Sequence, residues 1–251
     1  MLSVRQLHFT YNRAFSLNIE KLDISDGSLS VIIGPNGSGK TTFAKIISGL
    51  IDDYEGSVEI DSYDIKKLDI KNRSRIISYI HRRMVKDLYI SVERFVRIGR
   101  YVHKESVFLN LNKQDRMIID EMLDVVDLRQ KKDMLLSQLS DGELQRAIIA
   151  KILCQQTKYA VLDEPTSALD IAHIASILNL LSRIKSKTTI IVILHDINEA
   201  IKIYDNLICL NEGRVECSWT KEDVFDLQKL EKLFKIKLNE FKHGLGRVVY
   251  F

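Results

Sequence analysis

Apolar and polar positions follow two different patterns in the segments of the chain that predict strands. Residues 2–9 and 15–22 alternate apolar and polar side chains, which predicts two half-buried strands that pair in antiparallel fashion. The runs 29–33, 159–162 and 188–194 are apolar at most positions instead. A strand that is apolar on both faces is typical of a parallel sheet that helices cover on both sides.

Helical periodicity dominates the middle of the chain. Over residues 85–157 the strand signals vanish and apolar side chains recur every three or four positions, which predicts a helical insertion. A further helix is predicted from Asp170 onward. Residues 206–210 and 214–217, separated by Asn-Glu-Gly, predict a closing hairpin, and an amphipathic helix with a short extended tail follows.

Together these elements predict one α/β domain over residues 1–251. Its sheet should be mixed but mainly parallel, with an N-terminal antiparallel β region and a helical insertion subdomain. We expect the core to comprise residues 1–84 and 158–251, and the helical subdomain to comprise residues 85–157.

Composition narrows the function classes. With 251 residues, of which 45% are hydrophobic, the chain can bury a large core, and a net charge of +3 is too mild to indicate a nucleic-acid surface. The apolar runs fall short of the roughly 20 residues that a membrane helix needs, and no signal peptide is evident. Cys154, Cys209 and Cys217 lack metal-site spacing, so we expect buried thiols.

A phosphate-binding loop is predicted between the strand at 29–33 and the helix that follows. Its glycines let successive N–H groups approach a triphosphate, and the new helix adds its positive N-terminal end. The lysine would reach the β and γ phosphates, and the first threonine would offer a hydroxyl to Mg²⁺. The fold should therefore be a P-loop NTPase core. The loop comprises Gly34, Pro35, Asn36, Gly37, Ser38, Gly39, Lys40, Thr41 and Thr42.

Carboxylates and a histidine follow two of the apolar strands. Asp163 and Glu164 end the first strand, and because side chains alternate along a strand they should face different ways. One carboxylate can hold the Mg²⁺ shell, and the other can orient or deprotonate an attacking water. His195 ends the next strand, where it could bond to a γ-phosphate or simply cap the following helix.

Two further candidates each have an ordinary structural interpretation. Ser140 precedes a predicted helix, with Gly142 and Glu143 in its first turn. Ser140 and Glu143 have the spacing of a capping box, and the same helix N-terminus could also bind an anion. Tyr11 lies between the two N-terminal strands, where its ring could stack on a nucleotide base or be a plain turn residue.

Four motifs together resemble the ATP-binding cassette family in order and in spacing. They are the phosphate-binding loop, Leu-Ser-Asp-Gly-Glu-Leu-Gln-Arg at 139–146, Leu-Asp-Glu-Pro-Thr-Ser-Ala-Leu-Asp at 162–170, and Leu-His-Asp around His195. The segment Arg-Ile-Gly-Arg-Tyr-Val-His at 97–103 is similar to one in the ATPases of ferric-siderophore, haem and cobalamin importers.

The resemblance implies a head-to-tail homodimer that binds two ATP molecules with Mg²⁺. Each ATP would lie between the phosphate-binding loop of one copy and Ser140 and Gly142 of the other. Tyr11 would stack on the base, Glu164 would be the catalytic base, and His195 would sense the γ-phosphate. Lys40 would act in catalysis as well as in binding, and Thr41 and Asp163 would hold the metal.

The sequence departs from the family pattern at His81, where the family places a glutamine that reaches the metal. An imidazole nitrogen is a softer ligand than an amide oxygen and suits Mg²⁺ less well. We therefore expect His81, as a metal-site residue, to weaken Mg²⁺ coordination and the coupling between the two subdomains. The alternative is that a one-residue shift or a water molecule replaces the amide.

The partners that the resemblance implies are membrane permease subunits and, indirectly, an extracytoplasmic substrate-binding protein. The chain would lie on the cytoplasmic face of the membrane as a peripheral ATPase of an importer, with Arg97, Arg100 and Tyr101 meeting the permease. The alternatives are an ABC-type nucleotide switch and a catalytically weak regulatory subunit. No nucleic-acid partner is expected.

Overall fold

The structure is a computed structural model. It describes residues 1–11, 15–81, 88–104, 111–223, 226–243 and 246–250, with only the main chain for residues 81, 240–243 and 246–248.

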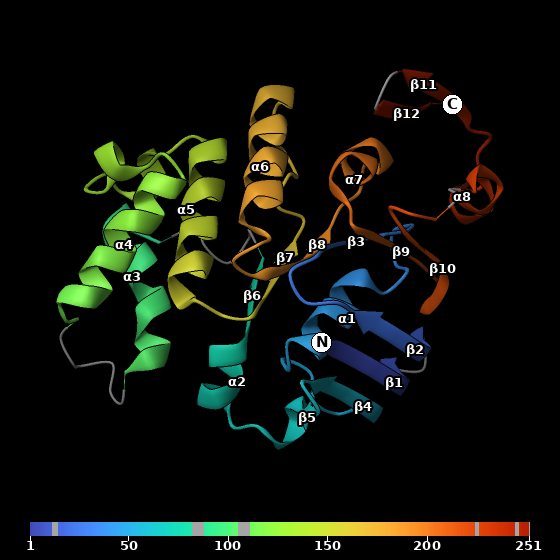
Figure 1. Ribbon diagram of the computed structural model, residues 1–251, viewed down its shortest axis with the longest axis horizontal. Coiled ribbons are helices and arrows are strands. Elements are labelled where there is room, and N and C mark those ends of the chain that lie inside the picture. The colour runs from blue at the N-terminus through green and yellow to red at the C-terminus, as the bar shows by residue number, and fades with distance from the viewer. Residues whose placement is uncertain (12–14, 82–87, 105–110, 224–225, 244–245, 251) are drawn as a thin grey trace.

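A six-stranded sheet in the order β10-β9-β3-β8-β7-β6 forms the centre of the molecule (Figure 1). The neighbours from β9 to β6 pair in parallel, and β10 pairs antiparallel with β9, which confirms the mixed, mainly parallel sheet. All side chains of β3, β7 and β8 are buried, as the apolar runs predict. The strands are β3 (Leu29–Ile33), β6 (Ile77–His81), β7 (Tyr159–Asp163), β8 (Thr189–Ile193), β9 (Asn206–Asn211) and β10 (Arg214–Thr220).

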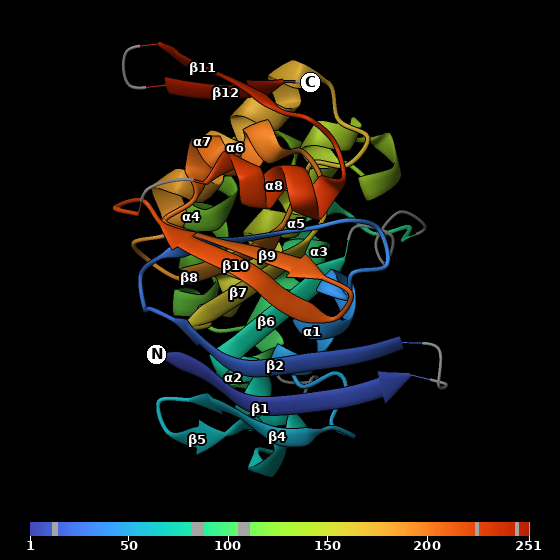
Figure 2. The same ribbon diagram turned by 90° about the vertical axis from the view of Figure 1, so that its right-hand side faces the viewer.

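The predicted N-terminal antiparallel region is confirmed as a second sheet in the order β2-β1-β4-β5 (Figure 2). Helix α1 (Lys40–Ile47) packs into the core between the two sheets, and its Phe43 is fully buried there. The strands are β1 (Leu2–Tyr11), β2 (Phe15–Ile24), β4 (Glu55–Ile60) and β5 (Tyr63–Asp64).

Helices occupy the described residues between β6 and β7, as the periodicity predicts. They lie together at one end of the molecule, on the left in Figure 1. The exact limits of the helical subdomain stay a prediction. Its helices are α3 (Val92–Arg97), a 3₁₀ turn at Ile98–His103, α4 (Lys113–Val125), 3₁₀ turns at Arg129–Lys131 and Leu136–Gln138, and α5 (Asp141–Gln155).

The remaining helices flank the core strands. Helix α6 begins after Asp170, whose carboxylate accepts from the His173 N–H, as the sequence predicts for a helix starting here. The helices are α2 (Ile70–Ile76), which follows a 3₁₀ turn at Ile65–Lys67, α6 (Ile171–Ile184), α7 (Ile197–Ile203) and α8 (Leu227–Phe234).

The tail after α8 is a hairpin of β11 (Asn239–His243) and β12 (Gly246–Tyr250), where the sequence indicates only a short extended segment. The side-chain amide of Asn198 in α7 donates to the Val249 carbonyl at 2.9 Å and accepts from the Val249 N–H at 2.8 Å. A side chain thus provides the pairing that a neighbouring strand would otherwise supply.

Gly213, in the turn between β9 and β10, joins three parts of the fold. Its N–H donates to the Ser38 carbonyl at 3.0 Å, and its carbonyl accepts from the Asn18 N–H at 2.7 Å. A Cβ at this position would lie 1.8 Å from the Ser16 carbonyl oxygen, and φ is +76°. Only glycine fits this contact without displacement.

Two predictions about the whole chain can be compared with the structure. The three cysteines are buried free thiols, as expected. Among the described residues no helix is both long enough and apolar enough to span a bilayer.

Asp205, just before β9, ties α6 to the start of β3. Its carboxylate accepts from the Leu29 N–H at 2.8 Å and from the Lys185 ammonium at 2.6 Å. Burial by itself would raise the pKa of Asp205, but these bonds and a contact with Lys221 outweigh it and lower the pKa. The carboxylate therefore stabilises the fold only while it is ionised.

We predict that Asp205→Asn lowers the free energy of unfolding by about 1.5–3 kcal/mol at pH 7, the range for hydrogen bonds to charged groups. Because the folded pKa lies below the unfolded value of about 3.9, the advantage of the natural residue is complete well above that value. The difference in unfolding free energy between the natural protein and the variant should shrink as the pH falls through the folded pKa of Asp205. Urea unfolding of both proteins between pH 7 and pH 3 measures this, and a pH-independent difference contradicts it.

Candidate active site

The loop after β3 has the conformation that a phosphate cradle needs. Gly34, Gly37 and Gly39 all have positive φ, at +152°, +78° and +102°. A Cβ on Gly34 would lie 2.0 Å from the Leu210 carbonyl oxygen, so the loop runs directly against β9. Gly39 is the N-cap of α1, so the loop leads straight to the N-terminal end of a helix.

The Lys40 ammonium is held by its own loop. Its Nζ donates to the Gly34 carbonyl at 2.8 Å and to the Pro35 carbonyl at 2.9 Å, and the residue is 6% exposed. Burial lowers the pKa of Lys40, while the charges of Glu164 and Asp163 act in the opposite direction. A buried cation of this kind is matched to an anionic ligand.

Asp163 lies at the carboxyl end of β7 and is 2% exposed. Its Oδ1 lies 3.4 Å from the Thr41 hydroxyl, and its Oδ2 accepts from the Tyr79 hydroxyl at 3.1 Å. Burial and the charge of Asp163 raise the pKa of Tyr79, so the phenol stays protonated and acts as the donor. Among the described residues no group of three or more His, Cys, Asp or Glu side chains could hold a metal ion.

Glu164 directly follows the last residue of β7 and pairs with a different neighbour from Asp163. It has φ of +56°, which is rare for a non-glycine residue, and its N–H donates to the Ile193 carbonyl at 3.2 Å. Its Oε1 lies 2.6 Å from Nε2 of His195, which is the second residue after β8 and so reaches the same edge of the sheet. Asp196, and not His195, caps α7.

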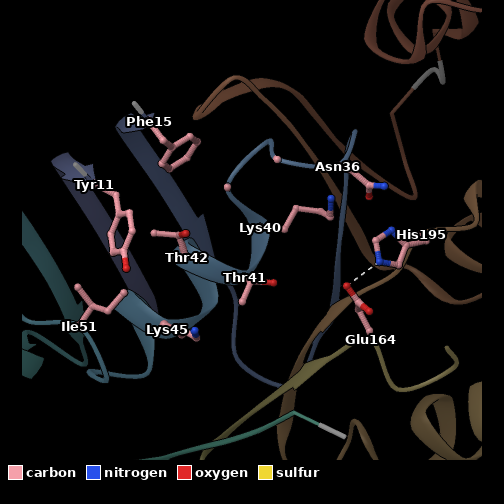
Figure 3. A pocket seen from close by; sticks show the side chains of 12 residues that line it. Tyr11, Phe15, Asn36, Lys40, Thr41, Thr42, Lys45, Ile51, Glu164 and His195 are labelled. Atoms are coloured by element: carbon pink, nitrogen blue, oxygen red, sulfur yellow. Dashed lines mark ion pairs between the residues drawn. The ribbon is translucent and has the colours of Figure 1, made fainter. Parts of the chain in front are cut away.

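These groups surround a cavity of 460 Å³, shown in Figure 3. Tyr11 and Phe15 stand on one side, Lys40 lies in the middle, and the Glu164 and His195 pair closes the other side. The sequence gives no signal for Phe15, Lys45 or Ile51 as lining residues, because each also fits an ordinary strand, helix or loop position. The lining residues are Tyr11, Phe15, Asn36, Gly37, Gly39, Lys40, Thr41, Thr42, Lys45, Ile51, Glu164 and His195.

The structure does not bring Ser140 and Gly142 to this cavity. Ser140 caps α5 by accepting from the Glu143 N–H at 3.3 Å, and Glu143 accepts from the Ser140 N–H at 3.0 Å, which confirms the capping box. A Cβ on Gly142 would lie 2.0 Å from Cδ2 of His173, so Gly142 serves close packing between α5 and α6.

Two expectations concern the segment from His81 to His103. The main chain of His81 pairs with Asp163 at the end of β6, but its side chain lies outside the described residues. The expectation that Arg100 meets a partner is wrong, because Arg100 is 6% exposed. Its guanidinium donates internally to Asp115 at 3.1 Å and to the carbonyl of Cys154 at 2.8 Å.

Comparison with known proteins agrees with this geometry. The family model described as ABC transporter matches residues 17–167. The chain is 33% identical to the petrobactin import ATP-binding protein FpuC of Bacillus anthracis, over 96% of this chain and 89% of that protein. It is 31% identical to the ferric enterobactin transport ATP-binding protein FepC of Escherichia coli, over 90% of this chain and 83% of that protein.

Solved structures show the same fold. A metal-chelate type ABC transporter in an inward-facing conformation aligns with a TM-score of 0.84 at 24% identity, covering 99% of this chain and 95% of that chain. An ATP-binding cassette solved as a dimer after hydrolysis, with ADP and Pi bound, aligns with a TM-score of 0.76 at 27% identity. The alignment covers 89% of this chain and 100% of that chain.

The loop glycines give a matched pair of substitutions. Both Gly37 and Gly39 have positive φ, but an added Cβ at Gly37 meets nothing within 4 Å, whereas at Gly39 it would lie 2.6 Å from Cζ of Phe15. We predict that Gly37→Ala costs about 1 kcal/mol of folding free energy through backbone strain alone. Gly39→Ala should cost about 1–3 kcal/mol more, because Phe15 must also move. Urea unfolding of the two variants checks this, and equal losses would refute it.

Proposed function

The chain belongs to the ABC transporter family, and we propose that it is the ATP-hydrolysing subunit of an importer for iron-siderophore, haem or cobalamin-type cargo. The observation that carries this proposal is the convergence of Lys40, Thr41, Asp163 and the Glu164–His195 pair at one edge of the sheet. The import of ferric siderophores by the relatives supports the cargo class.

ATP would enter with its base against Tyr11, which is 62% exposed, and Phe15, with its phosphates along the glycine loop. The Lys40 ammonium would exchange the Gly34 and Pro35 carbonyls for phosphate oxygens. That exchange replaces two neutral acceptors with charged ones, which adds the attraction between opposite charges to each hydrogen bond. The loop therefore keeps Lys40 satisfied before the nucleotide binds.

The residues beside the loop fit Mg²⁺, a hard cation that takes oxygen ligands. The Thr41 hydroxyl and Oδ1 of Asp163 lie 3.4 Å apart and would hold it, together with phosphate oxygens. When bound, the cation would neutralise charge on the β and γ phosphates. The role of His81 stays a prediction from the sequence.

Glu164 is positioned to act on a water molecule at the γ-phosphate. Its carboxylate can accept the proton of the attacking water, and His195, 2.6 Å away, holds that carboxylate in place. The positive φ of Glu164 supports this role, because strained backbone at a site edge persists only where the surroundings impose it. His195 also lines the cavity and could bond to the γ-phosphate.

A second copy of the chain would complete the site. Ser140 and Gly142 do not line the cavity of their own chain, so in this proposal they meet the ATP of the other copy in a head-to-tail dimer. The cassette structure solved as a dimer with ADP and Pi supports a dimer. Membrane permease subunits would bind the helical part, where Tyr89 is 82% exposed and Leu88 is 38% exposed, and an external substrate-binding protein would select the cargo.

The catalytic part of the proposal predicts two effects on ATP turnover with Mg²⁺. Glu164→Gln should lower the rate by 10²–10⁴-fold, the usual contribution of a general base. Turnover per chain should rise with protein concentration, because the composite site needs two copies. Glu20→Gln, on the exposed face of β2, is the matched control. An active Glu164→Gln protein would exclude Glu164 as the base.

The transport part of the proposal predicts a phenotype in the source cell. Deletion of the gene should abolish uptake of radiolabelled ferric siderophore, and the natural sequence should restore it whereas Glu164→Gln should not. Uptake of radiolabelled cobalamin and of radiolabelled haem, measured in the same strains, distinguishes the cargo classes. Undiminished uptake of all three cargoes in the deletion strain would contradict the importer assignment while leaving the ATPase assignment intact.

A further inference from the structure

The buried carboxylate of Asp163 has a separate partner for each of its oxygens. Oδ1 faces Thr41, on the side of the phosphate-binding loop, and Oδ2 accepts from the Tyr79 hydroxyl at 3.1 Å. Rotation of the carboxylate about the Cβ–Cγ bond out of its present plane would break the bond to Tyr79 and turn the other oxygen away from Thr41. The phenol therefore fixes the plane of the carboxylate and keeps one oxygen facing the loop.

The register of the sheet explains why a tyrosine occupies this position. Tyr79 in β6 lies opposite Val161 in β7, so Asp163 is two residues farther along the neighbouring strand. Two residues of a strand span about 6.6 Å, which a phenol can bridge and the short hydroxyl side chains cannot. Phenylalanine would keep the ring in the same place and remove only the donor.

We propose that Tyr79 is a positioning residue that fixes the plane of the Asp163 carboxylate, so that one of its oxygens is directed at the metal site beside Thr41. This inference deepens the proposed function and rests on it. Partners of metal-binding carboxylates orient the ligand before the metal arrives, and their loss typically weakens metal binding by 10–100-fold. Tyr79 touches neither nucleotide nor metal in this arrangement, so its effect passes entirely through Asp163.

The test is Mn²⁺ binding, measured by electron paramagnetic resonance in the presence of a non-hydrolysable ATP analogue. Tyr79→Phe should weaken Mn²⁺ binding about 10-fold, which corresponds to about 1.4 kcal/mol. Binding of the analogue without metal should stay unchanged, because Tyr79 does not line the cavity. Turnover at saturating Mg²⁺ should recover most of the natural rate.

Tyr159→Phe is the matched control, because Tyr159 lies in the same strand as Asp163 and its buried hydroxyl donates to Asp26, away from the site. It should leave Mn²⁺ binding unchanged. Asp163→Asn sets the reference for a lost ligand, and adding Tyr79→Phe to it should have no further effect, because the substituted residue has no carboxylate left to orient.

The outcomes separate this inference from the proposed function. If the natural protein binds no Mn²⁺ with the analogue, the proposed ATPase site fails. If Asp163→Asn weakens binding and Tyr79→Phe does not, the site stands and the role of Tyr79 is refuted. Equal losses from Tyr79→Phe and Tyr159→Phe, or a further loss in the double variant, would show a general structural effect and also refute it.

Discussion

The chemistry of this protein depends on the burial of β3, β7 and β8 on both faces. Parallel strands that are covered on both sides have only their ends available for polar groups, and their carboxyl ends lie at one edge. The loop after β3, the carboxylates that end β7 and the histidine after β8 therefore meet at that edge. A one-residue slip of β7 in the register would move Asp163 to the other face of the sheet, away from Thr41.

Charge at this edge is arranged around one buried cation. The Lys40 ammonium satisfies two loop carbonyls, and the carboxylates of Asp163 and Glu164 are each held by a neighbour, Tyr79 and His195. Each group thus has a defined partner before any ligand arrives. Preorganised charges of this kind need little rearrangement when a triphosphate binds, which is where the largest electrostatic contribution to catalysis arises.

Much of the fold and of the site follows from local sequence. The period of two over 15–22, the apolar run 29–33 and the Ser140–Glu143 capping box each determine structure through residues that are close in the chain. Partners far apart in the chain could not be predicted in this way. Arg100 was expected at the surface, but it is buried against Asp115, because periodicity indicates that a face is polar without showing which group lies across from it.

The turn at Gly213 has a consequence for how sequences of this fold can change. It joins the phosphate-binding loop, β2 and the β9–β10 hairpin entirely through main-chain atoms, the Ser38 carbonyl, the Asn18 N–H and the Ser16 carbonyl. Main-chain atoms are the same for nearly every residue type, so the three flanking segments can exchange their side chains without moving the loop. The tolerance of all three segments depends on one position that admits no side chain.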